Sequence, residues 1–190
     1  MILYYNVEKY DKNGLVSKTG KRRARSFVKA FIFMLANRFT GAAYTTENTS
    51  GSPTYMIYQN YYRLFTTPSQ SNLQTQGIVV GSSSSAVQST HYSLQSIIGN
   101  GKSTDQLQFG PHISDKAVTV SAPNASFSIS RIFRNSSGGD VTVREIGFYV
   151  VAYNYTKWFC IIRDVVSPSI VVSDTKYIKV TYTFQVTSGT

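Results

Sequence analysis

The sequence predicts a mainly β protein, an antiparallel β-sandwich of jelly-roll type with an N-terminal hairpin and one α-helix. Tyr, Val, Ser and Thr are abundant while Glu, Ala and Leu are sparse, a balance that favours strands over helices. Short apolar or alternating runs recur along most of the chain and are separated by Gly, Pro, Asp and Ser, as in antiparallel sandwiches. With 190 residues and 42% apolar content, the chain can fill one sizeable core.

The chain should begin with a β-hairpin followed by the helix. Two strand-like runs, residues 3–10 and 15–18, flank a turn that ends in the Asn-Gly dipeptide at residues 13–14, which is a strong hairpin signal. Ser26 can cap a helix over residues 27–39. The apolar residues of this helix extend well beyond one stripe, so we expect it to be covered on more than one side.

Positive charge is concentrated in the same region. Residues 1–40 contain nine basic and two acidic residues, which gives +7 of the chain's net charge of +10. We therefore expect residues 1–41 to be a docking arm and residues 42–190 to be the sandwich domain. The docking residues expected in the arm are Lys21, Arg22, Arg23, Arg25, Phe27, Phe31, Met34 and Leu35.

Residues 126–154 read as the central hairpin of the sheet. Both halves show strand patterns, and residues 137–139, Ser-Gly-Gly, tolerate the positive φ of a short hairpin loop. A three-residue loop would place Arg131 directly across from Glu145. We expect these two residues to form a structural ion pair that is at least partly buried, because their strand neighbours are apolar.

The rest of the chain supplies further strands. They are predicted near residues 54–58, 61–66, 78–81, 107–109, 117–121, 157–162, 169–172 and 177–186. The last of these alternates most regularly, with Ile178, Val180, Tyr182 and Phe184 on one face.

The sequence does not contain a recognisable set of catalytic residues. The two histidines, His91 and His112, have no carboxylate or cysteine at metal-ligand spacing. Glu145 has no evident second carboxylate facing it, which glycoside hydrolysis usually needs. Cys160 lies in an apolar run, so a buried thiol is expected. We predict no catalytic residues, no metal and no cofactor. The N-terminus does not resemble a secretory signal and the longest apolar run, residues 30–36, is too short for a membrane span, so we expect assembly in the cytosol.

The basic cluster at residues 21–25 has two interpretations. Contact with nucleic acid would need its positive charges and would be strongly dependent on salt. A solvated loop, or a basic face that docks onto an acidic partner, fits better, because the aromatic residues here are patterned for packing rather than for base stacking.

Six short segments of the chain carry a resemblance. They are ARSFVK at 24–29, GIVVGSSSSAVQSTHYSL at 77–94, FSISRIFRN at 127–135, VTVREIGFYV at 141–150, IIRDVV at 161–166 and IKVTYTFQV at 178–186. Together they resemble poorly characterised virion proteins of tailed bacteriophages over about residues 24–186. The resemblance implies a sandwich or jelly-roll building block that is repeated in the capsid, neck or tail.

The leading hypothesis is therefore a non-enzymatic virion structural protein, assembled in the host cytoplasm. Its partners would be further copies of itself and other virion proteins, with no membrane. The alternative from another class is a carbohydrate-binding module of a phage adhesin, in which Tyr58, Tyr61 and Tyr62 would form a platform for sugar stacking. Nucleic-acid binding through the basic arm is the third hypothesis.

Overall fold

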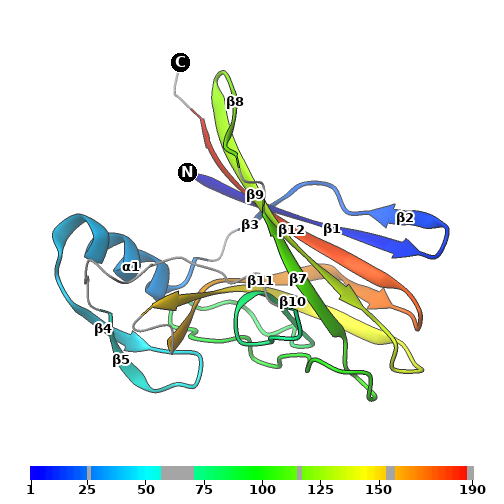
Figure 1. Cartoon of the computed structure of the whole chain (residues 1–190). Coiled ribbons are helices and arrows are strands. Elements are labelled where there is room, and N and C mark those ends of the chain that lie inside the picture. Colours follow the sequence, from blue (N-terminus) through cyan, green and yellow to red (C-terminus); the bar gives the residue numbers. More distant parts are fainter. Residues whose placement is uncertain (25–26, 57–70, 115–116, 153–156, 188–190) are drawn as a thin grey trace.

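The computed structural model describes residues 1–24, 27–56, 71–114, 117–152 and 157–187. Within this part of the chain, a seven-stranded sheet, a three-stranded sheet and a two-stranded ribbon accompany one α-helix (Figure 1). The elements are β1 Ile2–Asp11, β2 Gly14–Lys18, β3 Arg22–Ala24, α1 Lys29–Thr40, β4 Tyr44–Glu47, β5 Pro53–Met56, β6 Gly77–Gly81, β7 Gln108–Ser114, β8 Thr119–Ser121, β9 Asn124–Arg134, β10 Val141–Ala152, β11 Lys157–Val172 and β12 Tyr177–Thr187. All strand pairs are antiparallel, which confirms the predicted fold class.

The two larger sheets enclose the core. The seven-stranded sheet has the order β2-β1-β12-β9-β7, with β3 also on β1 and β8 also on β9, and it curls over the three-stranded sheet β11-β10-β6 (Figure 1). Tyr182 of β12 is fully buried between them, with its ring 6.0 Å from that of Phe148 in an edge-to-face contact. Its hydroxyl donates a hydrogen bond of 3.2 Å to Oδ2 of Asp164 in the other sheet.

The N-terminal strand is an inner strand of the large sheet. β1 pairs with β12 from Ile2 opposite Gln185 to Tyr10 opposite Tyr177, and its other edge pairs with β2 and β3. The side chains of Leu3, Tyr5 and Val7 are buried in the core. The predicted hairpin of β1 and β2 is confirmed, but these residues belong to the sandwich and not to an arm that could be removed from it.

The predicted central hairpin is wrong, because β9 and β10 lie in different sheets. β9 pairs with β12, β7 and β8, whereas β10 pairs with β11 and β6. The turn between them is a corner held by the fully buried Asn135, whose amide nitrogen donates to the carbonyl oxygens of Gly139 at 2.7 Å and Val172 at 2.6 Å. Its Oδ1 accepts from the backbone N–H of Ser137 at 2.9 Å. A glycine-rich turn allowed either geometry, and the buried asparagine stabilises the corner.

The helix is close to the prediction but begins two residues later. Its N-cap is Val28, without a side-chain cap, and the predicted cap Ser26 lies outside the described residues. Its C-terminus is as expected: Gly41 takes a left-handed conformation with φ 67° and donates to the carbonyl oxygen of Asn37. The helix packs at one end of the sandwich, beside β11 and the ribbon of β4 and β5 (Figure 1).

One long strand replaces two that were predicted separately. β11 runs through residues 157–172, although Pro168 lies within it. Proline cannot donate to a strand partner, but β11 is an edge strand of its sheet, so this position is tolerated. The strand predicted at residues 61–66 lies outside the described residues.

Candidate assembly surfaces

A fully buried ion pair joins the two long strands of the small sheet. Nε of Arg163 on β11 donates to Oε2 of Glu145 on β10 at 2.7 Å, and both side chains are 0% exposed. A charge this deep is tolerated only when it is paired and hydrogen-bonded. Glu145 therefore has the structural role expected of it, but its partner is Arg163.

The same two side chains fasten residues 82–98, here called the serine-rich loop, to the small sheet. Oε1 of Glu145 accepts from the backbone N–H of Ser96 at 2.8 Å, and Nη2 of Arg163 donates to the carbonyl oxygen of Ser85 at 3.0 Å. Gly81 permits this close approach, because a Cβ there would lie 2.5 Å from the Glu145 carboxylate. The ion pair thus supports a segment that has no regular strand of its own.

His91 completes this anchor. Its Nδ1 lies 3.2 Å from Nη1 of Arg163 and accepts from the backbone N–H of Gln88 at 3.1 Å. Since arginine can only donate, Nδ1 is an acceptor in both contacts and the ring is neutral. Burial, and then the nearby Arg163, hold the pKa of His91 below its ordinary value, while Glu145 acts in the opposite direction.

Arg131 occupies a second buried site, in the large sheet, where no carboxylate of the described residues is hydrogen-bonded to it. Its guanidinium donates to four backbone carbonyl oxygens, those of Leu73, Gln76, Ile78 and Gly110, at 2.7 to 2.9 Å. It also lies over the rings of Phe109 and Phe133, at 4.9 and 5.8 Å from the ring centroids. Burial lowers the pKa of Arg131 to about 10, so the group remains cationic at neutral pH.

The predicted pair of Arg131 and Glu145 is therefore wrong. The two residues lie in different sheets, and each is fully buried with other partners. Arg163 and Asp164 were not among the predicted site residues, although the sequence contains a signal for them: both interrupt the apolar run at residues 159–166, just as Glu145 interrupts its own strand.

The described polar residues show no cluster of metal-ligand type. Among these residues no group of three or more His, Cys, Asp or Glu side chains could hold a metal ion. Nε2 of His112 accepts from the backbone N–H of Ile78 at 2.8 Å, and burial raises the pKa of the Cys160 thiol, which leaves it in the unreactive protonated form. The described part of the chain also contains no helix with the length and apolar character needed to cross a membrane.

The basic cluster of the predicted docking arm is largely engaged within the molecule. Arg22 donates to the carbonyl oxygen of Ser167 and also contacts the hydroxyl of Tyr5. Lys21 donates to Oε1 of Gln185 at 3.2 Å and lies 4.3 Å from the centroid of the Tyr4 ring. Arg25 lies outside the described residues. These contacts weaken the interpretation of residues 21–25 as a single free basic face.

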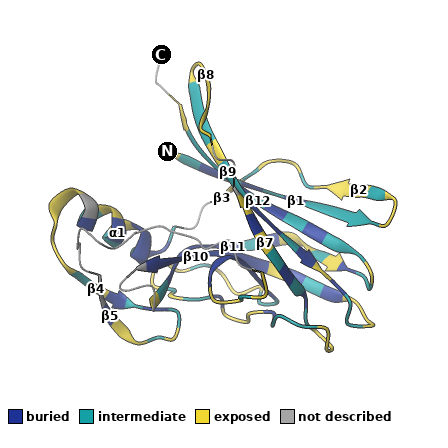
Figure 2. Ribbon diagram, in the orientation of Figure 1, coloured by how far each residue is buried: buried dark blue, intermediate teal, exposed yellow. Residues whose placement is uncertain are grey.

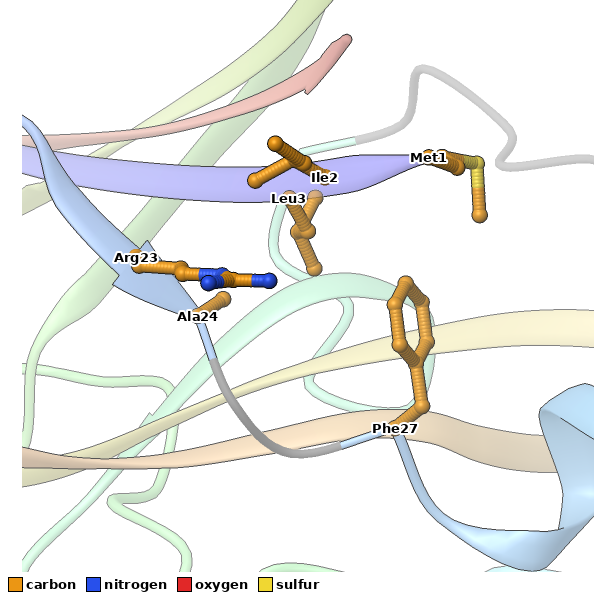
Figure 3. Close-up of a pocket in the computed structure, with 6 residues that line it drawn as sticks. All are labelled: Met1, Ile2, Leu3, Arg23, Ala24 and Phe27. Atoms are coloured by element: carbon orange, nitrogen blue, oxygen red, sulfur yellow. The ribbon is translucent and has the colours of Figure 1, made fainter. Parts of the chain in front are cut away.

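Two of the predicted docking residues, Arg23 and Phe27, line one surface pocket. It has a volume of about 370 Å³ and lies where the start of β1 faces the end of β3 and the segment that leads into α1 (Figure 3). Met1, Ile2, Leu3 and Ala24 complete its lining. The pocket can accept an apolar side chain beside one guanidinium.

The helix divides the remaining predicted docking residues between two faces. Met34 and Phe31 are 0% and 8% exposed and pack into the molecule's own core, so they are not available for docking. On the outer face Ile32, Leu35 and Phe39 are 56%, 38% and 82% exposed. Their spacing of three and four residues places them on one side of the helix, here called the outer helix face.

The tyrosines of the proposed sugar platform, Tyr58, Tyr61 and Tyr62, lie outside the described residues, so this alternative stays a prediction. Comparison of the chain with protein-family models, with curated proteins and with solved structures found no match.

Proposed function

We propose that this protein is a non-enzymatic structural component of a tailed-bacteriophage virion, present in multiple copies and assembled in the host cytoplasm. The observation that carries the proposal is the outer helix face. Three large apolar side chains stand together on the solvent side of α1, and clustered exposed apolar residues mark surfaces that bind other proteins. The sequence resemblance to virion proteins supplies the setting.

The neighbouring features support docking at this end of the molecule. The pocket of Arg23 and Phe27 lies beside the start of the helix segment, so apolar and cationic contacts are available within one region (Figure 3). Lys29, at the first turn of α1, is already neutralised by Glu47 at 2.5 Å. Because this ion pair balances the charge three residues before Ile32, the outer helix face is available for apolar contact with a neighbouring virion protein.

The buried polar groups have roles in support and not in chemistry. Arg131, Arg163 and Glu145 are bonded to backbone groups or to each other, and none is exposed. A substrate could not reach them without displacing the segments they hold. This arrangement is typical of a rigid building block.

The test is incorporation into particles. Virions purified from a host that carries the coding sequence should contain many copies of the chain by quantitative mass spectrometry. A variant with Ile32→Ser and Phe39→Ser should be incorporated at less than about a tenth of the wild-type level, because losing such apolar contacts weakens an interface by several kcal/mol.

The matched control is Leu15→Ser with Val16→Ser on β2, where the two side chains are 55% and 54% exposed at a distance from the helix in the fold (Figure 2). This control should enter particles normally. Particles that lack the chain, or that accept the helix variant as readily as the control, would refute the proposal.

A further inference from the structure

The inner face of the seven-stranded sheet continues beyond the smaller sheet that covers it. Strand pairing aligns Tyr5 with Tyr182 and Ile129, then Leu3 with Phe184 and Phe127, and finally Val186 with Ala125. Val120 of β8 faces Ala125 and extends this stripe. Figure 1 shows β8, the adjoining end of β9 and both chain ends projecting away from the three-stranded sheet.

Along this stripe the residues stay apolar but change from buried to exposed, as the ribbon colours show towards β8 (Figure 2). Tyr182 is 0% exposed, Phe127 is 38%, Val186 is 50% and Val120 is 75%. The rings of Phe127 and Phe184 stack with their centroids 4.8 Å apart. Phe148 of the smaller sheet makes an edge-to-face contact with Phe184, at 6.1 Å between ring centroids. Beyond this contact, the described residues place no second layer over the stripe.

A shallow groove of about 130 Å³ lies on the exposed part of the stripe. Its side chains include Met1, Val118, Ala125, Phe127, Phe184 and Val186, and none of the lining residues carries a charged side chain. Apolar surface of this kind is stabilised when it is removed from water. The lining of the groove therefore favours an apolar occupant.

The charge distribution favours a second copy of this chain as that occupant. Residues 1–7, 117–130 and 181–187, here called the charge-free end, contain no Asp, Glu, Lys, Arg or His, in a chain of net charge +10. Exposed sheet edges are usually protected from self-association by charged residues, and the described edge strand β8, Thr119–Ser121, carries none. Two copies that each carry +10 repel one another, and the repulsion is smallest where the contact is farthest from charged side chains. Lys21 reaches this region on the opposite face of β12, where it contacts Gln185.

We propose that two copies of this chain associate through their charge-free ends, apolar stripe against apolar stripe, about a two-fold axis. In such an interface the same patch is used twice, so it must complement itself. Aromatic rings flanked by valines and short side chains meet this requirement, because they need no partner of opposite charge. The inference rests on the proposed function only for its biological setting, a protein present in many copies.

Sedimentation equilibrium over a wide range of protein concentration tests the proposal. The wild-type chain should form dimers, and the dimers should tighten between about 0.02 M and about 0.3 M salt, because salt screens the repulsion between two basic copies. Val186→Lys should weaken dimerisation on the order of a hundredfold, since each dimer would bury two like charges. Val120→Lys should have the same effect.

The matched control is Val16→Lys, which adds the same charge at a valine of similar exposure, 54% against 50% for Val186. It should dimerise like the wild type, and circular dichroism should show that all three variants are folded. A wild-type chain that stays monomeric, or dimers that Val186→Lys and Val120→Lys leave intact, would overturn the inference.

These outcomes are separate from those of the particle experiment. Dimers that Ile32→Ser with Phe39→Ser abolishes, while Val186→Lys does not, would refute the charge-free end as the contact and leave the virion proposal standing. Dimers of the predicted kind from a chain that is absent from particles would refute the virion proposal alone.

Discussion

The two buried arginines hold the irregular parts of the chain to the sandwich in two different ways. Arg163, in the small sheet, is paired with Glu145 and fastens the serine-rich loop, residues 82–98. Arg131, in the large sheet, is hydrogen-bonded to no carboxylate of the described chain and fastens the segment before β6 through the carbonyl oxygens of Leu73 and Gln76. Both side chains are fully buried.

The difference shows that a buried cation can be stabilised by oriented backbone dipoles as well as by a counter-ion. The site of Arg131 has carbonyl oxygens and aromatic faces, and burial still lowers its pKa to about 10. At Arg163, by contrast, the charge is balanced directly. Removing Glu145 should therefore leave the buried charge of Arg163 without a counter-ion. Removing Arg131 should leave only uncharged carbonyl oxygens without a donor.

The largest effect is expected for Glu145→Ala. The substitution leaves the Arg163 guanidinium buried without its counter-ion and removes the acceptor for Ser96, so the free energy of unfolding should fall by about 3 to 5 kcal/mol. Chemical denaturation at neutral pH measures this loss.

The double variant Arg163→Met with Glu145→Leu serves as the control for stranded charge. Apolar residues of similar volume remove both charges together, so it should be more stable than Glu145→Ala alone, although it also loses contacts to the serine-rich loop. A double variant less stable than the single one would mean that the loop contacts, and not the charge, dominate at this site.

A smaller effect is expected for Arg131→Met. Methionine can pack against the rings of Phe109 and Phe133, over which the guanidinium lies, so the main loss is the hydrogen bonding of buried carbonyl groups, at about 2 to 3 kcal/mol after local rearrangement. Arg134→Met, at an exposed position of the same strand, should change stability by less than about 0.5 kcal/mol. If Arg131→Met is more harmful than Glu145→Ala, the contrast between the two sites is reversed.

The fold class was predictable because strand and turn patterns are local. The hairpin of β1 and β2, the buried strand β6 and the alternating strand β12 all follow from periodicity and turn residues. The connection between sheets was not predictable in this way. Asn135 decides between a hairpin and a corner, and its hydrogen bond to Val172 joins residues 37 positions apart in the sequence.

The assembly surfaces were predictable only in part for a related reason. Helical spacing gave the excess apolar residues of α1, but it could not show that Phe31 and Met34 face the core while Ile32 and Phe39 face solvent. The exposed stripe on β9 and β12 looks like any core face in the sequence. Its exposure depends on where the smaller sheet ends, which is a property of the tertiary structure.

The smallest effect concerns the pH dependence of the Arg163 site. His91 accepts hydrogen bonds from Arg163 and Gln88, and Arg163 and Glu145 are the charged groups that face it. Its pKa in the folded state lies below the ordinary value of about 6.5, so as pH falls past that value the unfolded chain binds a proton before the folded chain does. The contribution of His91 to stability is thus present at neutral pH and is lost as pH falls below about 6.5.

His91→Asn tests this, because the asparagine oxygen can replace Nδ1 as an acceptor but does not titrate. The variant should match the wild type near pH 8 and should lose less stability than the wild type between about pH 7 and pH 5, as measured by denaturant unfolding at each pH. The carboxylates with lowered pKa values, Glu8, Asp11 and Glu47, lose their contributions at lower pH and are common to both proteins. Parallel curves for the two proteins across this range would show that protonation of His91 does not act on the serine-rich loop.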